Sequence, residues 1–292
     1  MSKLRRLDLN NKATTDDYVD FSIADINYTS GGVLYKYIER DSEGNPLYIY
    51  KSGILNSKRF SNRESIMEYI CSEILDYLEI PHATYSLAKS NLSLSSKWIS
   101  QEILISKSKW FIDENREIFI HANKIVPNNL FRKPTAYDEI MALIPEVEED
   151  LNNMILFDFL VNNTDRHFKN FGFVTNTETE ETRLSPLYDH GFCLGIEYDS
   201  EYLSMVLDDE EDDIDFDLEE NLYNSDTSKS FGTSNRSCLS LVKSSNLLKG
   251  KSLEELLNIV DNYSEYLPKN NIEFAKIILT TRYEILVERY GN

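Results

Sequence analysis

Residues 162–170 read Asn-Asn-Thr-Asp-Arg-His-Phe-Lys-Asn, and residues 187–191 read Leu-Tyr-Asp-His-Gly. The first stretch follows an apolar helical run, residues 154–161, and precedes a second apolar run, residues 171–174. A loop that opens from a buried helix and leads into a buried strand is a rigid support for exposed polar groups. The sequence therefore predicts a functional loop between a helix and a strand.

Three side chains of these stretches carry oxygen atoms suited to phosphoryl transfer: Asp165, Asn170 and, across a predicted hairpin, Asp189. One carboxylate can position an attacking hydroxyl, while the amide oxygen and the second carboxylate hold Mg²⁺ against nucleotide phosphates. Protein kinases space their catalytic-loop Asp and Asn in the same way, with the metal-binding Asp further along. An ordinary capped turn is the alternative, because Asp and Asn are common turn residues.

Composition indicates a folded protein, because 41% of the 292 residues are hydrophobic and 32 are Tyr or Phe. The length favours one bilobed unit or two domains. Thirty Lys and Arg against 50 Asp and Glu give a net charge of -20. Such a surface repels a phosphate backbone and anionic lipids, so we expect neither direct nucleic-acid binding nor membrane binding.

Residues 208–220 hold ten of the acidic residues and therefore half of the net charge. A dense run of like charge is typical of a solvated loop. The alternatives are a docking surface for a basic partner and an additional cation site.

Cys71, Cys193 and Cys238 are odd in number and lack CxxC spacing, which favours a reducing compartment. The four histidines are scattered and give a zinc site little support. Because the N-terminus has no apolar signal region and no run reaches membrane length, we expect a cytoplasmic protein.

The first half of the chain is predicted to be rich in strands. Ser30, Gly31 and Gly32 precede a β-rich run, and their amides could enclose anionic oxygens, although most Gly-Gly pairs form hairpin turns. Lys51 ends a predicted strand over residues 47–51, where it either faces a cleft or is a solvated edge lysine.

An amphipathic helix is predicted from Asn62 to Glu79. Its buried stripe repeats at three- and four-residue steps and comprises Ile66, Ile70, Ile74, Leu75 and Leu78. Glu64, Glu68 and Glu73 are its carboxylates, one of which could fix Lys51 in the manner of kinases. A further strand over residues 97–105 would offer an edge, at Gln101, Glu102 and Ile103, for an adenine ring.

Helical patterns dominate the second half. They cover residues 137–145, 148–160, 252–263 and 271–290, with a polar hairpin tip at 175–182. Strands with one helix followed by a mostly helical half predict an α+β fold in two lobes. We place the N-lobe at residues 1–105 and the C-lobe at residues 106–292.

Between Ser30 and about Leu194 the chain resembles the HipA-like serine/threonine kinases. The Asp165–Asn170 stretch resembles the catalytic loop of that family, Asp-x-His-x-Lys-Asn, and Pro186–Asp189 resembles its Pro-Leu-Tyr-Asp metal motif. Three further matches are the phosphate loop at Ser30–Val33, the strand lysine at Tyr50-Lys51 and the helix start at Glu68-Tyr69.

This resemblance implies a bilobed protein-kinase-like fold that uses ATP and Mg²⁺ to phosphorylate Ser or Thr in a protein. It implies Asp165 as catalytic base, Asn170 and Asp189 as Mg²⁺ ligands, and Lys51, paired with Glu68, as phosphate clamp. His167 and Lys169 would shape the loop and neutralise charge at the γ-phosphate; for His167 the alternative is a packed structural histidine.

The chain resembles the short stand-alone form of the family. Members often act as toxins paired with a DNA-binding antitoxin, so the resemblance makes an antitoxin-like partner a candidate. Some members phosphorylate their own phosphate loop, which here would mean Ser30 or Thr29.

Two other functions compete. The catalytic loop also resembles that of phosphoinositide kinases, so a lipid or small-molecule kinase is one alternative, against which the lack of a basic membrane-facing patch counts. A catalytically inactive kinase fold that serves as an interaction module is the other.

Overall fold

The computed structural model describes residues 34–56, 59–94, 99–126, 136–208 and 235–291. The chain falls into two compact units, unit 1 (Met1–Tyr69 with Thr84–Trp110) and unit 2 (Ile70–Ala83 with Phe111–Asn292). The chain thus crosses between the units after Tyr69, after Ala83 and after Trp110, and the lobe boundary after residue 105 stays a prediction.

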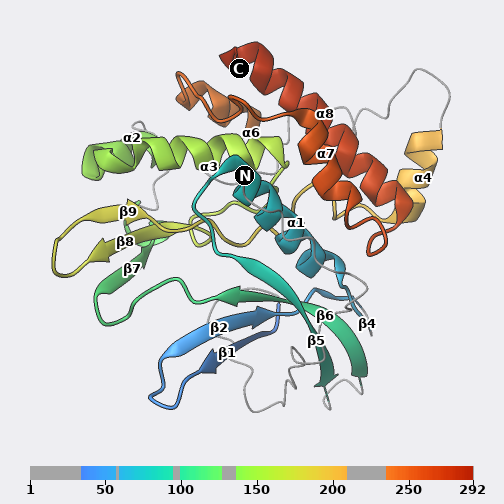
Figure 1. Ribbon diagram of the computed structural model, residues 1–292, viewed down its shortest axis with the longest axis horizontal. Helices are drawn as coiled ribbons and strands as arrows, with labels where there is room; N and C mark the ends of the chain where they lie inside the picture. The colour runs from blue at the N-terminus through green and yellow to red at the C-terminus, as the bar shows by residue number, and fades with distance from the viewer. Residues whose placement is uncertain (1–33, 57–58, 95–98, 127–135, 209–234, 292) are drawn as a thin grey trace. The chain divides into compact units, whose positions relative to one another are not determined.

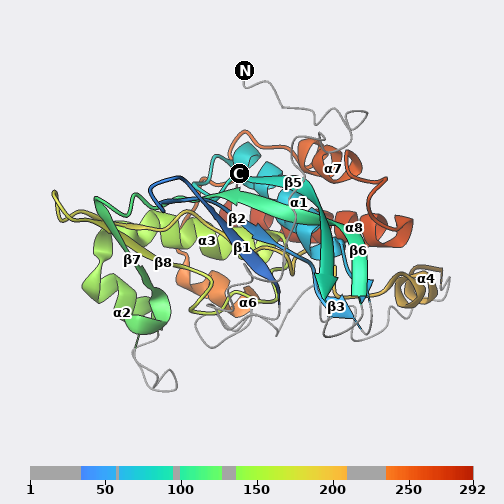
Figure 2. The same cartoon turned by 90° about the horizontal axis from the view of Figure 1, so that it is seen from below.

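Unit 1 is built on an antiparallel four-stranded sheet with the strand order β1-β2-β6-β5 (Figure 2). The strands are β1 (Lys36–Arg40), β2 (Pro46–Lys51), β5 (Tyr85–Leu94) and β6 (Ile99–Lys109). The strand predicted over residues 47–51 is confirmed. Its last residue, Lys51, is buried and is therefore not a solvated edge lysine.

Helix α1 (Arg63–Leu78) confirms the predicted amphipathic helix. All five apolar residues of the expected stripe are buried. The helix begins where Ser61 Oγ accepts the Arg63 N–H at 3.1 Å. It ends at Glu79, whose φ of 62° is left-handed, shortly before Pro81. A left-handed residue followed by proline is a common way to stop a helix.

Two long helices dominate unit 2. In α3 (Glu148–Leu160) every residue from Met154 to Leu160 is buried. Helix α8 (Lys269–Tyr290) packs against α3, α4 (Ser200–Asp208) and α7 (Leu253–Asp261), as Figure 1 shows. The remaining short elements are β3 (Leu55–Asn56), β4 (Arg59–Phe60), η4 (Ala122–Lys124), α2 (Ala136–Leu143), η5 (Pro145–Val147), α6 (Asn235–Cys238) and η7 (Leu239–Leu241).

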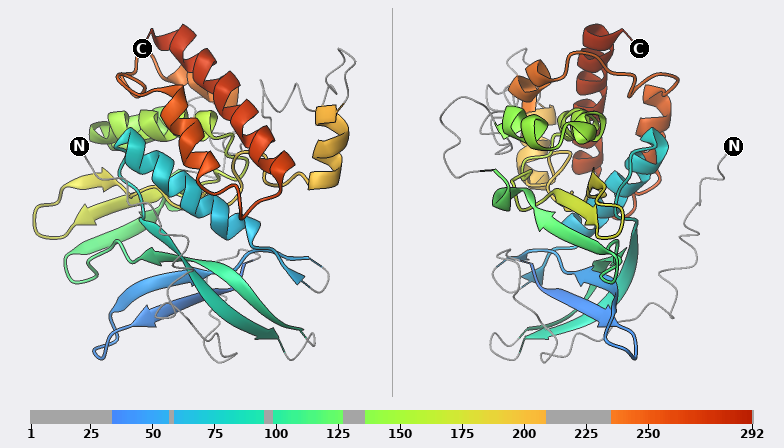
Figure 3. Two further views of the ribbon diagram at one scale, coloured as in Figure 1. Left: turned by 45° about the vertical axis from the view of Figure 1, so that its right-hand side comes forward. Right: turned by 90° about the vertical axis from the view of Figure 1, so that its left-hand side faces the viewer.

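Unit 2 also holds a three-stranded antiparallel sheet, β7-β8-β9, seen from two directions in Figure 3. Strands β8 (Gly172–Asn176) and β9 (Thr182–Leu184) form the predicted hairpin. Strand β7 (Glu117–His121) was not predicted, although its burial alternates with period two and leaves Ile118 and Ile120 exposed.

Helix α4 forms in a stretch for which no element was predicted. The composition of residues 221–246, rich in Ser, Asn and Thr, predicts a loop, but α6 and η7 form within this stretch. Of the acidic run 208–220, only Asp208 lies within the described residues, as the last residue of α4. Among the helices described, none has the length and apolar character needed to cross a membrane.

Gly195 and Gly250 give a matched pair of substitutions in unit 2. Both have left-handed φ angles, 69° and 72°. A Cβ at Gly195 would lie 2.3 Å from the Phe274 ring, whereas nothing lies within 4 Å of a Cβ at Gly250. Left-handed alanine costs about 1–2 kcal/mol, and overpacking a core adds about 1–3 kcal/mol.

We therefore predict that Gly195→Ala lowers the free energy of unfolding by about 2–5 kcal/mol and Gly250→Ala by about 1–2 kcal/mol. Urea unfolding of the two variants measures the difference. Equal losses would show that the Phe274 ring moves aside at no cost.

Candidate active site

The loop after α3 is fixed by its own asparagines. Asn162 ends the helix in a left-handed conformation, with φ of 48°. The side chain of Asn163 donates to Asp158 Oδ1 at 2.8 Å and accepts the backbone N–H of Asp165 at 3.0 Å. Asp158, buried near the end of α3, therefore positions the backbone at Asp165 through Asn163.

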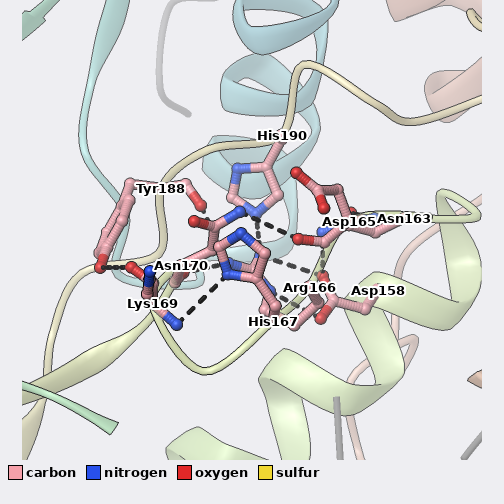
Figure 4. Close-up of polar contacts among 9 residues, drawn as sticks. All are labelled: Asp158, Asn163, Asp165, Arg166, His167, Lys169, Asn170, Tyr188 and His190. Carbon is pink, nitrogen blue, oxygen red and sulfur yellow. Dashed lines mark hydrogen bonds and ion pairs between the residues drawn. The ribbon is translucent and has the colours of Figure 1, made fainter. Parts of the chain in front are cut away.

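Arg166 is the centre of the site, and its side chain is fully buried. Its Nε and Nη2 bind the two carboxylate oxygens of Asp158 at 2.8 and 3.0 Å. Its Nη1 donates to the Asn170 carbonyl at 2.5 Å and to the Tyr188 carbonyl at 2.9 Å. Nη2 also lies 2.6 Å from Nε2 of His190 (Figure 4). All five N–H groups of the guanidinium therefore have acceptors.

These contacts define which atoms of His190 and Arg166 carry protons. Because a guanidinium only donates, His190 Nε2 must accept, so the ring is neutral with its proton on Nδ1. Burial opposes the charge of Arg166, but the charge and hydrogen bonds of Asp158 outweigh burial, and the pKa of Arg166 is raised. The buried charge of Arg166 is therefore balanced by the carboxylate of Asp158 and by hydrogen bonds from every guanidinium N–H group.

The same contacts hold the predicted catalytic loop to the predicted metal-binding turn. We call this connection between the two segments the junction at Arg166. Two backbone hydrogen bonds extend it: Thr164 N–H donates to Phe192 O at 3.0 Å, and Leu194 N–H donates to Val161 O at 2.7 Å. Asp189 lies between Tyr188 and His190, each of which provides an acceptor for Arg166. Its backbone has a left-handed φ of 67°. Such backbone strain in a residue other than glycine is typical of functional sites that the surroundings over-determine.

The structure therefore brings Asp165, Asn170 and Asp189 onto two segments that are locked together. Asp165 and Asp189 are half-buried, and Asn170 is buried. Asn170 donates Nδ2 to the Asp165 carbonyl at 2.9 Å, which orients the amide so that Oδ1 is its remaining acceptor. Carboxylate and amide oxygens are the ligands that Mg²⁺ prefers, so the donor set fits this ion.

Unit 1 pairs the predicted lysine and glutamate. Lys51 Nζ lies 2.8 Å from Glu68 Oε1, and both side chains are buried. The other carboxylate oxygen of Glu68 accepts a hydrogen bond from Ser106 Oγ on β6. Lys51 also lies over the Tyr85 ring, 5.6 Å from its centroid. Two neighbouring strands thus hold the pair in place.

The remaining predicted residues lie apart from these contacts or outside the described residues. Gln101, Glu102 and Ile103 pair with Leu92, Asn91 and Ser90 of β5, whereas the register with β2 covers only residues 106–109 of β6, so the adenine contact at residues 101–103 stays a prediction. His167 Nδ1 accepts the Lys169 N–H at 3.3 Å, so His167 does shape the loop. Ser30, Gly31 and Gly32 lie outside the described residues.

Sequence reasoning missed the residues behind the site. These are Asp158, Asn163, Arg166, His190 and Ser106. One signal was present: Asp158 is the only charged residue of the apolar run 154–161, and a lone carboxylate in a buried helix needs a cationic or hydrogen-bonding partner.

Comparison with solved structures shows a kinase-like α+β fold, as predicted. The chain is similar to the crystal structure of the Helicobacter pylori proinflammatory kinase CtkA, with a TM-score of 0.58, 16% identity, and 91% of this chain and 94% of that chain covered. Weaker similarities are to HipA of Shewanella oneidensis MR-1, in complex with HipB and its operator DNA (TM-score 0.45, 14% identity, 93% and 66% covered), and to the golgi casein kinase (TM-score 0.44, 12% identity, 92% and 71% covered).

A model of the HipA-like C-terminal domain matches residues 28–246, which is more than half of the chain. The chain therefore belongs to the family of HipA-like C-terminal domains, and the resemblance inferred from the motifs is confirmed. No curated protein matches the chain in sequence.

The role of Arg166 can be tested by its exchange for lysine. Lysine keeps the charge but has three N–H donors in place of five, so buried acceptors lose their donors. We predict that Arg166→Lys lowers the free energy of unfolding by about 2–4 kcal/mol, since each unsatisfied buried group costs about 1–3 kcal/mol.

Arg183→Lys is the matched control, because Arg183 pairs with Glu117 at 2.9 Å but is 44% exposed. An exposed ion pair contributes about 0–1 kcal/mol, so the control should lose no more than this. Urea unfolding of both variants measures the effect. Similar losses in the two would contradict the central role of Arg166.

Proposed function

We propose that this protein is an ATP- and Mg²⁺-dependent protein kinase that transfers the γ-phosphate of ATP to a serine or threonine hydroxyl of a protein. The main support is the junction at Arg166, which holds the segments bearing Asp165, Asn170 and Asp189 in one fixed arrangement. Family membership and the kinase-like fold agree with this function.

Each residue then has a role that its surroundings permit. Asp165 accepts the proton of the attacking hydroxyl, since a half-buried carboxylate on a fixed loop can orient the nucleophile. Asn170 and Asp189 would hold Mg²⁺, which when bound neutralises charge on the phosphates. His167 and Lys169 shape the loop, and Lys169 adds positive charge near the γ-phosphate.

Lys51 and Glu68 supply the phosphate clamp. Lys51 would contact the α- and β-phosphates, and the Glu68 carboxylate, held by Ser106, would keep the ammonium group in place. The phosphate loop at Ser30–Gly32 and the adenine contact at Gln101–Ile103 stay predictions of the family resemblance. The same holds for an antitoxin-like partner and a toxin role.

Exchange of Asp165 tests catalysis. Asp165→Asn keeps the volume of the side chain but removes the proton acceptor, so we expect phosphate transfer from labelled ATP, to the protein itself or to a mixed protein substrate, to fall by about 10²–10⁴-fold. Asp261→Asn makes the same chemical change in the surface pair with Lys276 and should keep activity.

A fall in the Asp165→Asn variant alone, with circular dichroism unchanged, supports the proposal. Equal label in the wild type and in Asp165→Asn would show that the kinase function is wrong, and would favour an inactive interaction module.

Exchange of Asp189 tests the metal site. Asn tolerates the left-handed conformation of residue 189 but removes the charge, so Asp189→Asn separates metal binding from backbone strain. We expect calorimetry to show at least a tenfold loss of ATP affinity in Mg²⁺, about 1.4 kcal/mol, with little change in EDTA. An affinity that is the same in both proteins would remove Asp189 from the metal site.

A further inference from the structure

A short 3-10 helix docks against the catalytic loop in unit 2. The backbone N–H of Ala122 donates to Phe171 O at 3.1 Å, and that of Asn123 donates to Phe168 O at 2.9 Å. This helix, η4, follows directly on His121 and ends at Lys124. Two basic residues outside the family motif, His121 and Lys124, thus lie beside the loop that carries Asp165.

His121 and Lys124 join two basic residues of the loop, His167 and Lys169, and we call these four residues the cationic patch. The Tyr188 hydroxyl lies 3.3 Å from His121 Nδ1 and donates to the Lys169 carbonyl at 3.0 Å. Burial lowers the pKa of His121, a hydrogen bond to the Lys169 backbone opposes this, and the charges of Lys169, His167 and Lys124 lower it further. The other three groups therefore lie close enough to act on the charge of His121.

Several cations of this protein are neutralised by a carboxylate of the chain. Lys51, Arg166, Arg183, Lys251 and Lys276 each form an ion pair within 3 Å. Within the described ranges, no member of the cationic patch forms an ion pair with a carboxylate. In a chain with 50 acidic and 30 basic residues, two exposed lysines and two imidazoles that form no ion pair with a carboxylate favour a site for an external anion.

An aromatic cluster holds His121 in place. The Phe119 ring contacts His121 edge-on at 4.6 Å between centroids, and Tyr188 stacks on Phe111 at 5.7 Å. A group that is held in place before binding loses less entropy when a ligand arrives. Lys124 and Lys169 are exposed, so a ligand can reach their ammonium groups.

We propose that the cationic patch binds an acidic group of the protein substrate, a carboxylate or phosphate close to the serine or threonine that is phosphorylated. The inference rests on the proposed kinase function and adds a substrate class to it. His167 is two residues from Asp165, so an anion held there lies beside the hydroxyl that Asp165 orients. The net charge of -20 does not prevent this, because charges beyond about 8 Å are screened at physiological salt.

Paired peptides test the inference. One serine peptide carries glutamates around the serine, and its partner carries lysines at the same positions. We expect the wild type to show a kcat/KM at least tenfold higher for the acidic peptide. Lys124→Glu should raise the KM for the acidic peptide about three- to tenfold and leave the KM for ATP unchanged, because an attraction becomes a repulsion near the surface.

Two controls separate the patch from general charge effects. Lys124→Arg keeps the charge and should keep the preference. Lys249→Glu reverses an exposed lysine on the turn before α7 and should leave the preference as in the wild type.

The outcomes are distinct. If the wild type phosphorylates the basic peptide as well as the acidic one, or if Lys124→Glu changes the KM for ATP instead, the inference is wrong while the kinase function stands. If the wild type transfers no phosphate to either peptide or to itself, both the kinase function and the inference are wrong.

Discussion

The buried ion pair of Arg166 and Asp158 is the interaction on which the rest of the site depends. Removing two charges from water costs several kcal/mol per ion, and the cost is recovered only if every donor and acceptor is satisfied. Here the guanidinium uses all five N–H groups, on one carboxylate, two carbonyls and one imidazole. The arrangement therefore tolerates little displacement of any partner.

Two of those partners belong to the predicted machinery. The carbonyl of Asn170 lies in the predicted catalytic loop and that of Tyr188 lies beside Asp189, the proposed metal ligand, so one side chain sets the distance between the two segments. The left-handed backbone of Asp189 is unfavourable for a residue with a side chain. The bonds of Arg166 to both sides of it hold that conformation in place.

The sequence predicts those parts of the fold that local patterns define. The period of α1 and α3 and the hairpin of β8 and β9 all come from neighbouring residues, and each forms as expected. Strand β7 and helix α4 were not predicted, because short elements with mixed polarity give weak periodic signals. The strand order β1-β2-β6-β5 could not be predicted either, because strand order in a sheet depends on contacts between distant segments.

The same division holds for the site. Asp165, Asn170 and Asp189 stand out as a spaced motif, and the choice of Glu68 from three glutamates relied on a family resemblance. The structure pairs Glu68 with Lys51 through contacts that no spacing reveals. Likewise the role of Asp158 depends on Arg166 eight residues later and on His190 beyond the hairpin, so only the folded chain shows it.

The most direct test asks whether Asp165, Asn170 and Asp189 converge on one metal–nucleotide complex. It is a crystal structure with Mn²⁺ and a non-hydrolysable ATP analogue, in which anomalous diffraction locates the metal. The account predicts a metal coordinated at about 2.1 Å by Asn170 Oδ1 and the Asp189 carboxylate, with Arg166 still bound to both carbonyls. A metal held by other residues, with Asn170 and Asp189 turned away from it, would contradict the account.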